Sequence, residues 1–362
     1  MRITGIAIAA LAVSGQAAFA GGLDRSGQDI GIIFEDGTYA ELSYGGIMPS
    51  VTGAAYANVA DAYSQTKLGF KTDFTDALSF ALIIDQPFGS DVSYKESSAT
   101  TTLGGTTAVI DSRAITGVLN YNVNDNFSVH AGVRSQTVSG SVTLDGLAYS
   151  TALGGLTPYN AVFAADQGVG WLAGAAFEMT EIALRVALTY NSEVTHDMAT
   201  SESFLGGPVV ATGTTTSNTP RSVNLDFQSG IAADTLLMGS VRWAEWGAFD
   251  VTPPLLGADL ADINDSWSYM IGVGRRFSDQ WSGVAQVSFE SAGDPLVSPL
   301  SPTNGLVGLA LAGVYTMDNY TITGGVSFTS VGDATPDVGG TPVATFAGNT
   351  VMAAGLTVGM HF

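Results

Sequence analysis

The chain has 362 residues, of which 46% are hydrophobic and only 12% are charged, and its net charge is -21 at pH 7. So acidic a chain lacks the basic surface that phosphate binding needs, which excludes nucleic acid as a partner. The absence of cysteine excludes a disulfide scaffold and any thiolate mechanism. The 45 glycines favour many strands joined by tight turns.

Residues 1–20 are typical of a secretory signal peptide. Arg2 precedes an apolar run over residues 3–13, and the small residues around Phe19 predict cleavage after Ala20. The run is shorter than the roughly 20 residues that a membrane-spanning helix needs. Residues 21–37 then form a short segment that lies in the periplasm or inside the fold, and four of its apolar side chains are candidates for burial: Ile30, Ile32, Ile33 and Phe34.

Residues 38–362 repeat a pattern that is typical of a transmembrane β-barrel. Segments of about ten residues alternate between apolar and polar side chains, and turn residues separate them. The pattern predicts an all-β fold, an antiparallel barrel of about fourteen strands, with the even strand number of bacterial single-chain barrels. A secreted β-sandwich or β-helix is the alternative, but a sandwich core does not explain polar side chains on one face of almost every strand.

The linkers between these segments alternate in length. Short turns such as residues 74–78 and 122–127 belong in the periplasm, and the long loops between them belong outside the cell. Both chain ends are therefore expected on the periplasmic side, with Phe362 ending the last strand. The chain is expected to be a monomer in the outer membrane of a Gram-negative bacterium, in contact with membrane lipid.

The third predicted strand, which starts at Leu78, contains a proline. Proline cannot donate a ladder hydrogen bond, and a following glycine lets the backbone turn. The site therefore has two interpretations, an opening in the barrel wall or the plain end of a strand at the outer rim. Its residues are Asp85, Gln86, Pro87, Phe88 and Gly89.

The face opposite the lipid carries both small apolar residues and isolated charges. Hairpin geometry predicts three ion pairs: Lys67 with Asp85, Glu178 with Arg185 on the diagonal, and Asp226 with Arg242. Such pairs are either structural ion pairs that stabilise a solvated barrel wall or groups that bind the polar part of a ligand. The candidates for ligand binding in the lumen are Lys67, Arg134, Arg185 and Arg242.

Residues 147–166, the third long loop, are more apolar than a solvated loop needs to be. Pro158 favours the start of a short helix that would present Tyr159, Val162 and Phe163 together. An exposed apolar patch of this kind predicts an external hydrophobic groove. A loop that folds over the barrel mouth is the alternative.

Several stretches resemble the FadL/TodX family of outer-membrane transporters: "AELSYGGIMPSVTG", "LGFKTDFTDALSFALIIDQPFG", "VRWAEWGAFDVTP" and the terminal "TVGMHF". The resemblance implies a fourteen-stranded barrel, an N-terminal plug, an external groove in the third and fourth loops, and an inward kink in the third strand that opens the wall sideways. It also implies transport of long-chain fatty acids and other hydrophobic compounds. The segment before the first strand is shorter here than the family's plug and lacks its Asn-Pro-Ala motif.

No enzymatic motif accompanies the three histidines. A Gly-x-Ser-x-Gly elbow and a histidine pair with metal-ligand spacing are both missing, and the acidic run that includes Asp259, Asp262 and Asp265 lacks the glycine and glutamate of a calcium loop. We therefore expect no enzyme, metal or cofactor. The sequence predicts a passive transporter for hydrophobic molecules such as long-chain fatty acids, with a general diffusion porin for small polar solutes as the alternative.

Overall fold

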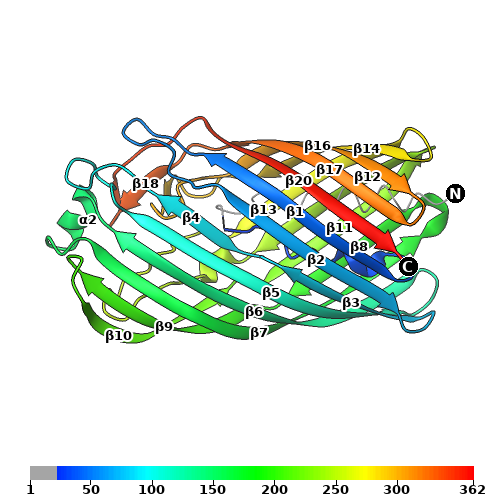
Figure 1. Ribbon diagram of the computed structural model, residues 1–362, viewed down its shortest axis with the longest axis horizontal. Coiled ribbons are helices and arrows are strands. Elements are labelled where there is room, and N and C mark those ends of the chain that lie inside the picture. Colours follow the sequence, from blue (N-terminus) through cyan, green and yellow to red (C-terminus); the bar gives the residue numbers. More distant parts are fainter. Residues whose placement is uncertain (1–22) are drawn as a thin grey trace.

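The computed structural model describes residues 23–362, so the predicted signal peptide lies outside the described residues. The chain runs up and down as antiparallel strands joined by short turns at one end and long loops at the other (Figure 1). The wall consists of β1 (Tyr39–Ser50), β2 (Tyr63–Asp73), β3 (Leu78–Asp85), β4 (Gly89–Ser93), β5 (Thr107–Asn122), β6 (Phe127–Leu144), β7 (Tyr159–Met179), β8 (Leu184–Asn191), β9 (Val194–Phe204), β10 (Val209–Thr219), β11 (Ser222–Ala232), β12 (Thr235–Ala244), β13 (Ser266–Arg276), β14 (Trp281–Glu290), β16 (Leu306–Met317), β17 (Tyr320–Val331) and β20 (Asn349–His361).

These strands close into one barrel. The last strand, β20, pairs with the first strand from Tyr39↔His361 to Ser50↔Thr350, which leaves no free edge. Three consecutive pairs, β3–β4, β8–β9 and β10–β11, each continue one another in the wall, so the 17 strands of the sheet make a 14-strand barrel. The prediction of an all-β antiparallel barrel of about fourteen strands is confirmed.

Side chains alternate between the outside and the inside of the wall. In β13, Trp267, Tyr269 and Ile271 are exposed on the outside, whereas Ser268 and Met270 are buried inside. An outward apolar band with aromatic residues near its ends is what a bilayer requires of a barrel. Among residues 23–362, no helix is long and apolar enough to cross a membrane.

The two ends of the barrel differ. The long loops carry the short helix α2 (Leu147–Ala152) and a small sheet of β15 (Leu296–Val297), β18 (Thr335–Val338) and β19 (Thr341–Pro342). Figure 1 shows α2 and β18 at the end of the barrel opposite the C-terminus. Below, we call the end with the long loops the loop end and the other the turn end.

The described residues form three buried apolar clusters, of which two bear on the site; the third consists of Leu236, Met238, Val284 and Val314. The inner cluster, toward the turn end, packs Ile30, Ile32 and Ile33 of the N-terminal segment against wall residues that include Ile83 and Leu172. The outer cluster lies beneath the long loops and includes the following side chains: Leu23, Phe88, Tyr94, Phe163, Met198, Trp246, Phe249, Leu260 and Phe346. Residues between the two clusters are largely polar, and they form the site described next.

Candidate functional site in the barrel lumen

The third barrel strand contains a bulge at Pro87. β3 ends at Asp85 and β4 begins at Gly89, yet both strands pair with β5. Residues 86–88 therefore lie opposite only residues 112 and 113 of β5, so this strand has one extra residue at that point. Because pairing resumes beyond it, Pro87 does not end the strand at the outer rim.

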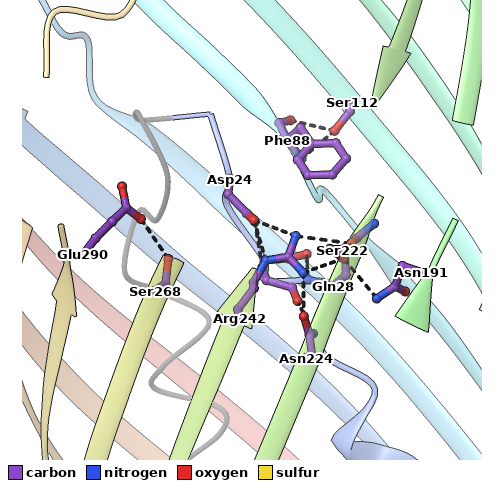
Figure 2. Close-up of polar contacts among 12 residues, drawn as sticks. Asp24, Gln28, Phe88, Ser112, Asn191, Ser222, Asn224, Arg242, Ser268 and Glu290 are labelled. Atoms are coloured by element: carbon purple, nitrogen blue, oxygen red, sulfur yellow. Dashed lines mark hydrogen bonds and ion pairs between the residues drawn. The ribbon is translucent and has the colours of Figure 1, made fainter. Parts of the chain in front are cut away.

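Side-chain groups replace the ladder hydrogen bonds that the bulge removes. The Ser112 hydroxyl accepts a hydrogen bond from the Phe88 amide at 2.8 Å and donates one to the Phe88 carbonyl at 2.6 Å, a contact visible in Figure 2. On the other side, Gln86 Oε1 accepts a hydrogen bond from the Thr66 amide at 3.1 Å. The Phe88 amide and carbonyl are thus satisfied by a side chain rather than by ladder bonds.

The bulge also interrupts pairing with β2. The β2–β3 ladder ends at Leu68↔Ile84. Backbone contact returns only nearer the loop end, where the Asp61 amide donates to the Asp91 carbonyl at 3.0 Å. Between these points the described residues form no backbone pairing across this seam, and we call this stretch the β2–β3 gap.

The N-terminal segment pairs with the bulge from inside the lumen. The Arg25 amide donates to the Pro87 carbonyl at 2.8 Å, and the Gly89 amide donates to the Leu23 carbonyl at 2.9 Å. Asp24 and Phe88 form an antiparallel bridge. The segment therefore replaces β2 as the pairing partner of the strand at this point.

Gly89 is required by the close approach of Arg25. A Cβ atom at Gly89 would lie 2.3 Å from Arg25 Cζ, so any other residue would displace the guanidinium group. That group stacks 4.0 Å from the centroid of the Tyr63 ring. Since Tyr63 begins β2 and Gly89 begins β4, the Arg25–Tyr63 pair occupies the inner side of the β2–β3 gap.

A buried polar network around Arg242 anchors the segment (Figure 2). The guanidinium group donates to Asp24 Oδ2 at 2.7 Å through Nε and to Gln28 Oε1 at 3.2 Å through Nη2. Its Nη1 donates to Ser222 Oγ at 2.9 Å and to Asn224 Oδ1 at 2.7 Å. One wall arginine thus holds two side chains of the N-terminal segment.

The other predicted lumen cations also contact this segment or its neighbours. Lys67 Nζ lies 2.8 Å from Asp29 Oδ2, and Arg185 Cζ lies 4.3 Å from the centroid of the Phe34 ring. Arg134 Nη1 donates to Asn191 Oδ1 at 3.1 Å, and Asn191 in turn contacts Ser222 of the Arg242 network. The four residues predicted to bind ligand therefore lie in the lumen, where their donors bind protein groups. Their role toward ligand stays a prediction.

The predicted pair of Lys67 with Asp85 is wrong. The β2–β3 ladder stops one position short of it, at Leu68. Lys67 instead contacts Asp29 and, at 3.1 Å, Glu41, while Asp85 accepts a hydrogen bond from Ser26 at 2.6 Å. The N-terminal segment supplies Asp29 and Ser26, which pairing rules between strands cannot anticipate, and β1 supplies Glu41.

The other two predicted pairs have different outcomes. Glu178 and Arg185 lie directly opposite one another rather than on the diagonal, with Oε1 and Nη1 3.8 Å apart. The pair of Asp226 with Arg242 is wrong, because Asn224 lies opposite Arg242 in the β11–β12 register. A bulge between Gly230 and Ala232 near the turn shifts that register.

The lower part of the segment fills the inner lumen. The helical turn η1 (Gly31–Phe34) places Ile32 and Ile33 in the inner cluster, and Ile30 is buried there as well, as the sequence predicted. Glu35 follows η1 and is also buried. Burial, together with the nearby charge of Glu41, raises the pKa of Glu35 to about 8.

This raised pKa predicts that docking of the segment depends on pH. The docked state holds a proton on Glu35 that the undocked state releases near pH 4.5, so docking weakens as the pH rises from 4.5 to about 8 and then levels off. We expect trypsin cleavage after Arg25, relative to cleavage of an unstructured reference peptide at the same pH, to increase over this range, and Glu35→Gln to remove the increase. Cleavage measured by mass spectrometry at each pH checks this, and an unchanged profile in Glu35→Gln would contradict it.

Above the bulge lies an apolar cavity, which we call the outer cavity. It spans about 660 Å³ of space not occupied by atoms, part of which is open to solvent, and most of its lining is aliphatic or aromatic. Leu23 belongs to both this lining and the segment that pairs with Gly89. Phe88 joins the same outer cluster through Trp246, with ring centroids 5.3 Å apart. The cavity therefore lies directly above the bulge.

The predicted groove helix at Pro158 is wrong. Tyr159 begins the strand β7, which pairs there with both β6 and β9, and the helix in this loop is α2, before the proline. Tyr159 and Phe163 are buried in the lumen, whereas Val162 faces outward and is 55% exposed. Ladder bonds on both sides stabilise the strand, and its twofold alternation separates side chains that a helix would group.

Phe163 was assigned to an external groove, but it lines the outer cavity. Several other cavity residues come from β9, β10 and the long loop after β12, and the sequence analysis named none of them as ligand contacts: Met198, Thr219, Phe249, Val251 and Leu260. Their inward positions could be found from strand alternation, but which of them meet in one cavity depends on loop packing. Within residues 23–362, no group of three His, Asp or Glu side chains is placed to hold a metal ion.

Comparisons with known proteins agree with this architecture. A family model described as "Outer membrane protein transport protein (OMPP1/FadL/TodX)" matches residues 37–293. A FadL homologue from Pseudomonas aeruginosa is 16% identical, with a TM-score of 0.75 over 96% of this chain and 95% of that chain. The toluene transporter TodX from Pseudomonas putida is 13% identical, with a TM-score of 0.65 over 91% and 90%.

A third solved structure, the toluene transporter TbuX from Ralstonia pickettii, is 13% identical, with a TM-score of 0.62 over 91% of this chain and 90% of that chain. At such identities these likenesses show the fold alone. No curated protein matches the chain. Because the family model spans most of the sequence, this chain belongs to the OMPP1/FadL/TodX family of outer membrane transport proteins.

Proposed function

We propose that the protein is a passive outer-membrane channel for hydrophobic molecules, which enter at the loop end and leave sideways through the β2–β3 gap. The observation that carries this proposal is the bulge at Pro87. Its backbone groups bind Ser112 and the N-terminal segment rather than β2, so the wall beside it stays closed only by side chains and by that segment. Unpaired backbone facing lipid would be costly, and here the N-terminal segment pairs the Pro87 carbonyl and the Gly89 amide from inside the lumen.

The lining of the route supports an apolar cargo. The outer cavity is largely apolar, and Leu23 in its lining belongs to the same apolar cluster as Phe88 at the bulge. Beyond it, the straight path to the turn end is filled by the inner cluster and the polar network around Arg242. A hydrophobic molecule that moves sideways into the bilayer gains about 0.8 kcal/mol per buried methylene. It need not pass the polar network.

The solved relatives that transport toluene suggest that the cargo includes small aromatic hydrocarbons. Long-chain fatty acids are a second cargo class. Their carboxylates would have to approach a chain of net charge -21, which slows anions. Lys67, Arg134, Arg185 and Arg242 are the residues that would bind such a carboxylate. Because β1 and β20 close the barrel within one chain, we propose that a monomer performs the transport.

Two measurements on the purified protein separate this function from that of a general diffusion porin. In proteoliposomes we expect protein-dependent uptake of toluene, and in planar bilayers we expect little ion conductance, because the N-terminal segment fills the lumen. A large, steady conductance without protein-dependent uptake of toluene or oleate would favour the porin and contradict the proposal. Lipid vesicles without protein serve as the control for passive partition.

A further inference from the structure

Five side chains in the otherwise apolar lining of the outer cavity carry polar groups, and two of them, His196 and Ser217, come from neighbouring strands. His196 on β9 and Ser217 on β10 lie directly opposite one another in the ladder, so both point to the same side of the wall. Both line the outer cavity, and they are only 1% and 4% exposed. The backbone at Gly168 leaves room for the imidazole, since a Cβ atom there would lie 3.1 Å from His196 Cε1.

Neither side chain forms a regular hydrogen bond with the protein, although Nδ1 of His196 lies 3.5 Å from the Asp166 carboxylate. In the part of the chain that the structure describes, both ring nitrogens of His196 and the hydroxyl of Ser217 lack a hydrogen-bond partner. Buried polar groups are normally paired. The buried Arg242, by contrast, has four partners in the lumen. Two adjacent unpaired groups at one apolar cavity indicate a place where a ligand supplies the missing bonds.

The surroundings define the charge of that ligand. Asp166 Oδ2 lies 3.5 Å from His196 Nδ1, so its negative charge favours the proton on Nδ1 and leaves Nε2 as an acceptor. Asp166 itself accepts a hydrogen bond from the Asp197 amide at 3.1 Å, which holds it in place. The described residues that line the cavity include no lysine or arginine. An anionic head group would therefore meet repulsion without a compensating cation.

We infer that His196 and Ser217 bind the hydroxyl group of a neutral hydrophobic molecule, a phenol or a long-chain alcohol, as it passes through the outer cavity. The ligand O–H donates to His196 Nε2, and its oxygen accepts from Ser217 Oγ. The apolar remainder lies against side chains such as Met198, Phe249 and Leu260. This inference rests on the proposed function and names a preferred class of cargo for the same channel.

The test compares three probes of similar shape: 4-butylphenol, butylbenzene and 4-butylbenzoate. Binding to the purified full-length protein in nanodiscs is measured by calorimetry. We expect the phenol to bind about tenfold more tightly than butylbenzene, since a satisfied pair of hydrogen bonds is worth about that much. His196→Leu and Ser217→Ala should each reduce this preference to about threefold or less, and leave the affinity for butylbenzene unchanged.

His130→Leu provides a matched control. His130 is also a buried lumen histidine with an unpaired Nδ1, but it lies beside Phe34 near the inner cluster and does not line the outer cavity. This variant should keep the preference for the phenol. Heat-modifiable migration on a gel verifies that each variant folds, and Ser217→Ala keeps the test available where His196→Leu does not fold.

The outcomes separate this inference from the proposed function. Equal binding of phenol and butylbenzene, or tighter binding of the benzoate, would overturn the hydroxyl site and leave a hydrophobic channel intact. The inference would also be overturned if His196→Leu and Ser217→Ala lowered the affinities for 4-butylphenol and butylbenzene equally. If no probe binds the unsubstituted protein and toluene uptake is absent as well, the proposed function fails together with the inference.

Discussion

Deleting Pro87 is expected to lower the uptake of hydrophobic molecules several-fold while the barrel still folds. The bulge has three residues opposite two, so removing one makes the ladder between β3–β4 and β5 continuous. Phe88 would then face Ser112 and keep its inward direction, since Ser112 is buried and its neighbours on β5 are exposed. A regular strand can pair with β2 and close the β2–β3 gap. Toluene uptake by proteoliposomes measures the effect.

Deleting Ile231 is the matched control for this experiment. Ile231 is the extra residue of the bulge between β11 and β12, on another part of the wall. Its removal also regularises a ladder but leaves the β2–β3 gap unchanged, so uptake should stay near the unsubstituted level. Equal uptake by the Pro87 deletion and the unsubstituted protein would mean that cargo takes another route.

Replacing Arg242 with methionine is expected to release the N-terminal segment from the lumen. Asp24 is 0% exposed, and the substitution leaves its carboxylate buried without a cation. Breaking a buried ion pair by removing one partner costs about 3–5 kcal/mol. The segment avoids this cost by undocking, which also breaks its pairing with the bulge. We expect higher ion conductance in planar bilayers and faster trypsin cleavage after Arg25.

Two further variants control for the loss of an arginine. Arg221→Met removes an arginine that pairs with Glu245 at the surface, and it should change neither conductance nor cleavage. The double variant Asp24→Leu with Arg242→Met should lose less docking free energy than the sum of the losses in Asp24→Leu and Arg242→Met. In the double variant neither partner of the ion pair remains as an unpaired buried charge. Unchanged conductance and cleavage in Arg242→Met would show that the other contacts alone hold the segment.

The strands were predictable because the side chains of each barrel strand alternate between two environments. Lipid outside and the lumen inside impose a twofold alternation on every strand, as Trp267 to Ile271 show in β13. The length of each linker then shows which end of the barrel has the short turns and which has the long loops. The position of the kink was predictable as well, because proline and glycine restrict the backbone locally, whatever the rest of the chain does.

The partners of the lumen charges were not predictable in the same way. Lys67, Asp85 and Arg242 were expected to pair across the wall, yet all three contact the N-terminal segment. That segment has no repeating pattern that reveals its path. The register of β11 with β12 likewise depends on a bulge at Ile231 that alternation does not reveal.

From the residues alone one can read the barrel, its strand number, which of its ends carries the long loops and the irregular point at Pro87, because these depend on local backbone preference and on solvent or lipid at each side chain. The three-dimensional arrangement decided that Pro87 interrupts the strand without ending it, because pairing resumes at Gly89. It also decided that Tyr159 belongs to a strand and that His196 and Ser217 meet in one cavity. These outcomes depend on contacts between residues far apart in the chain, and such contacts produce no periodic pattern in the sequence.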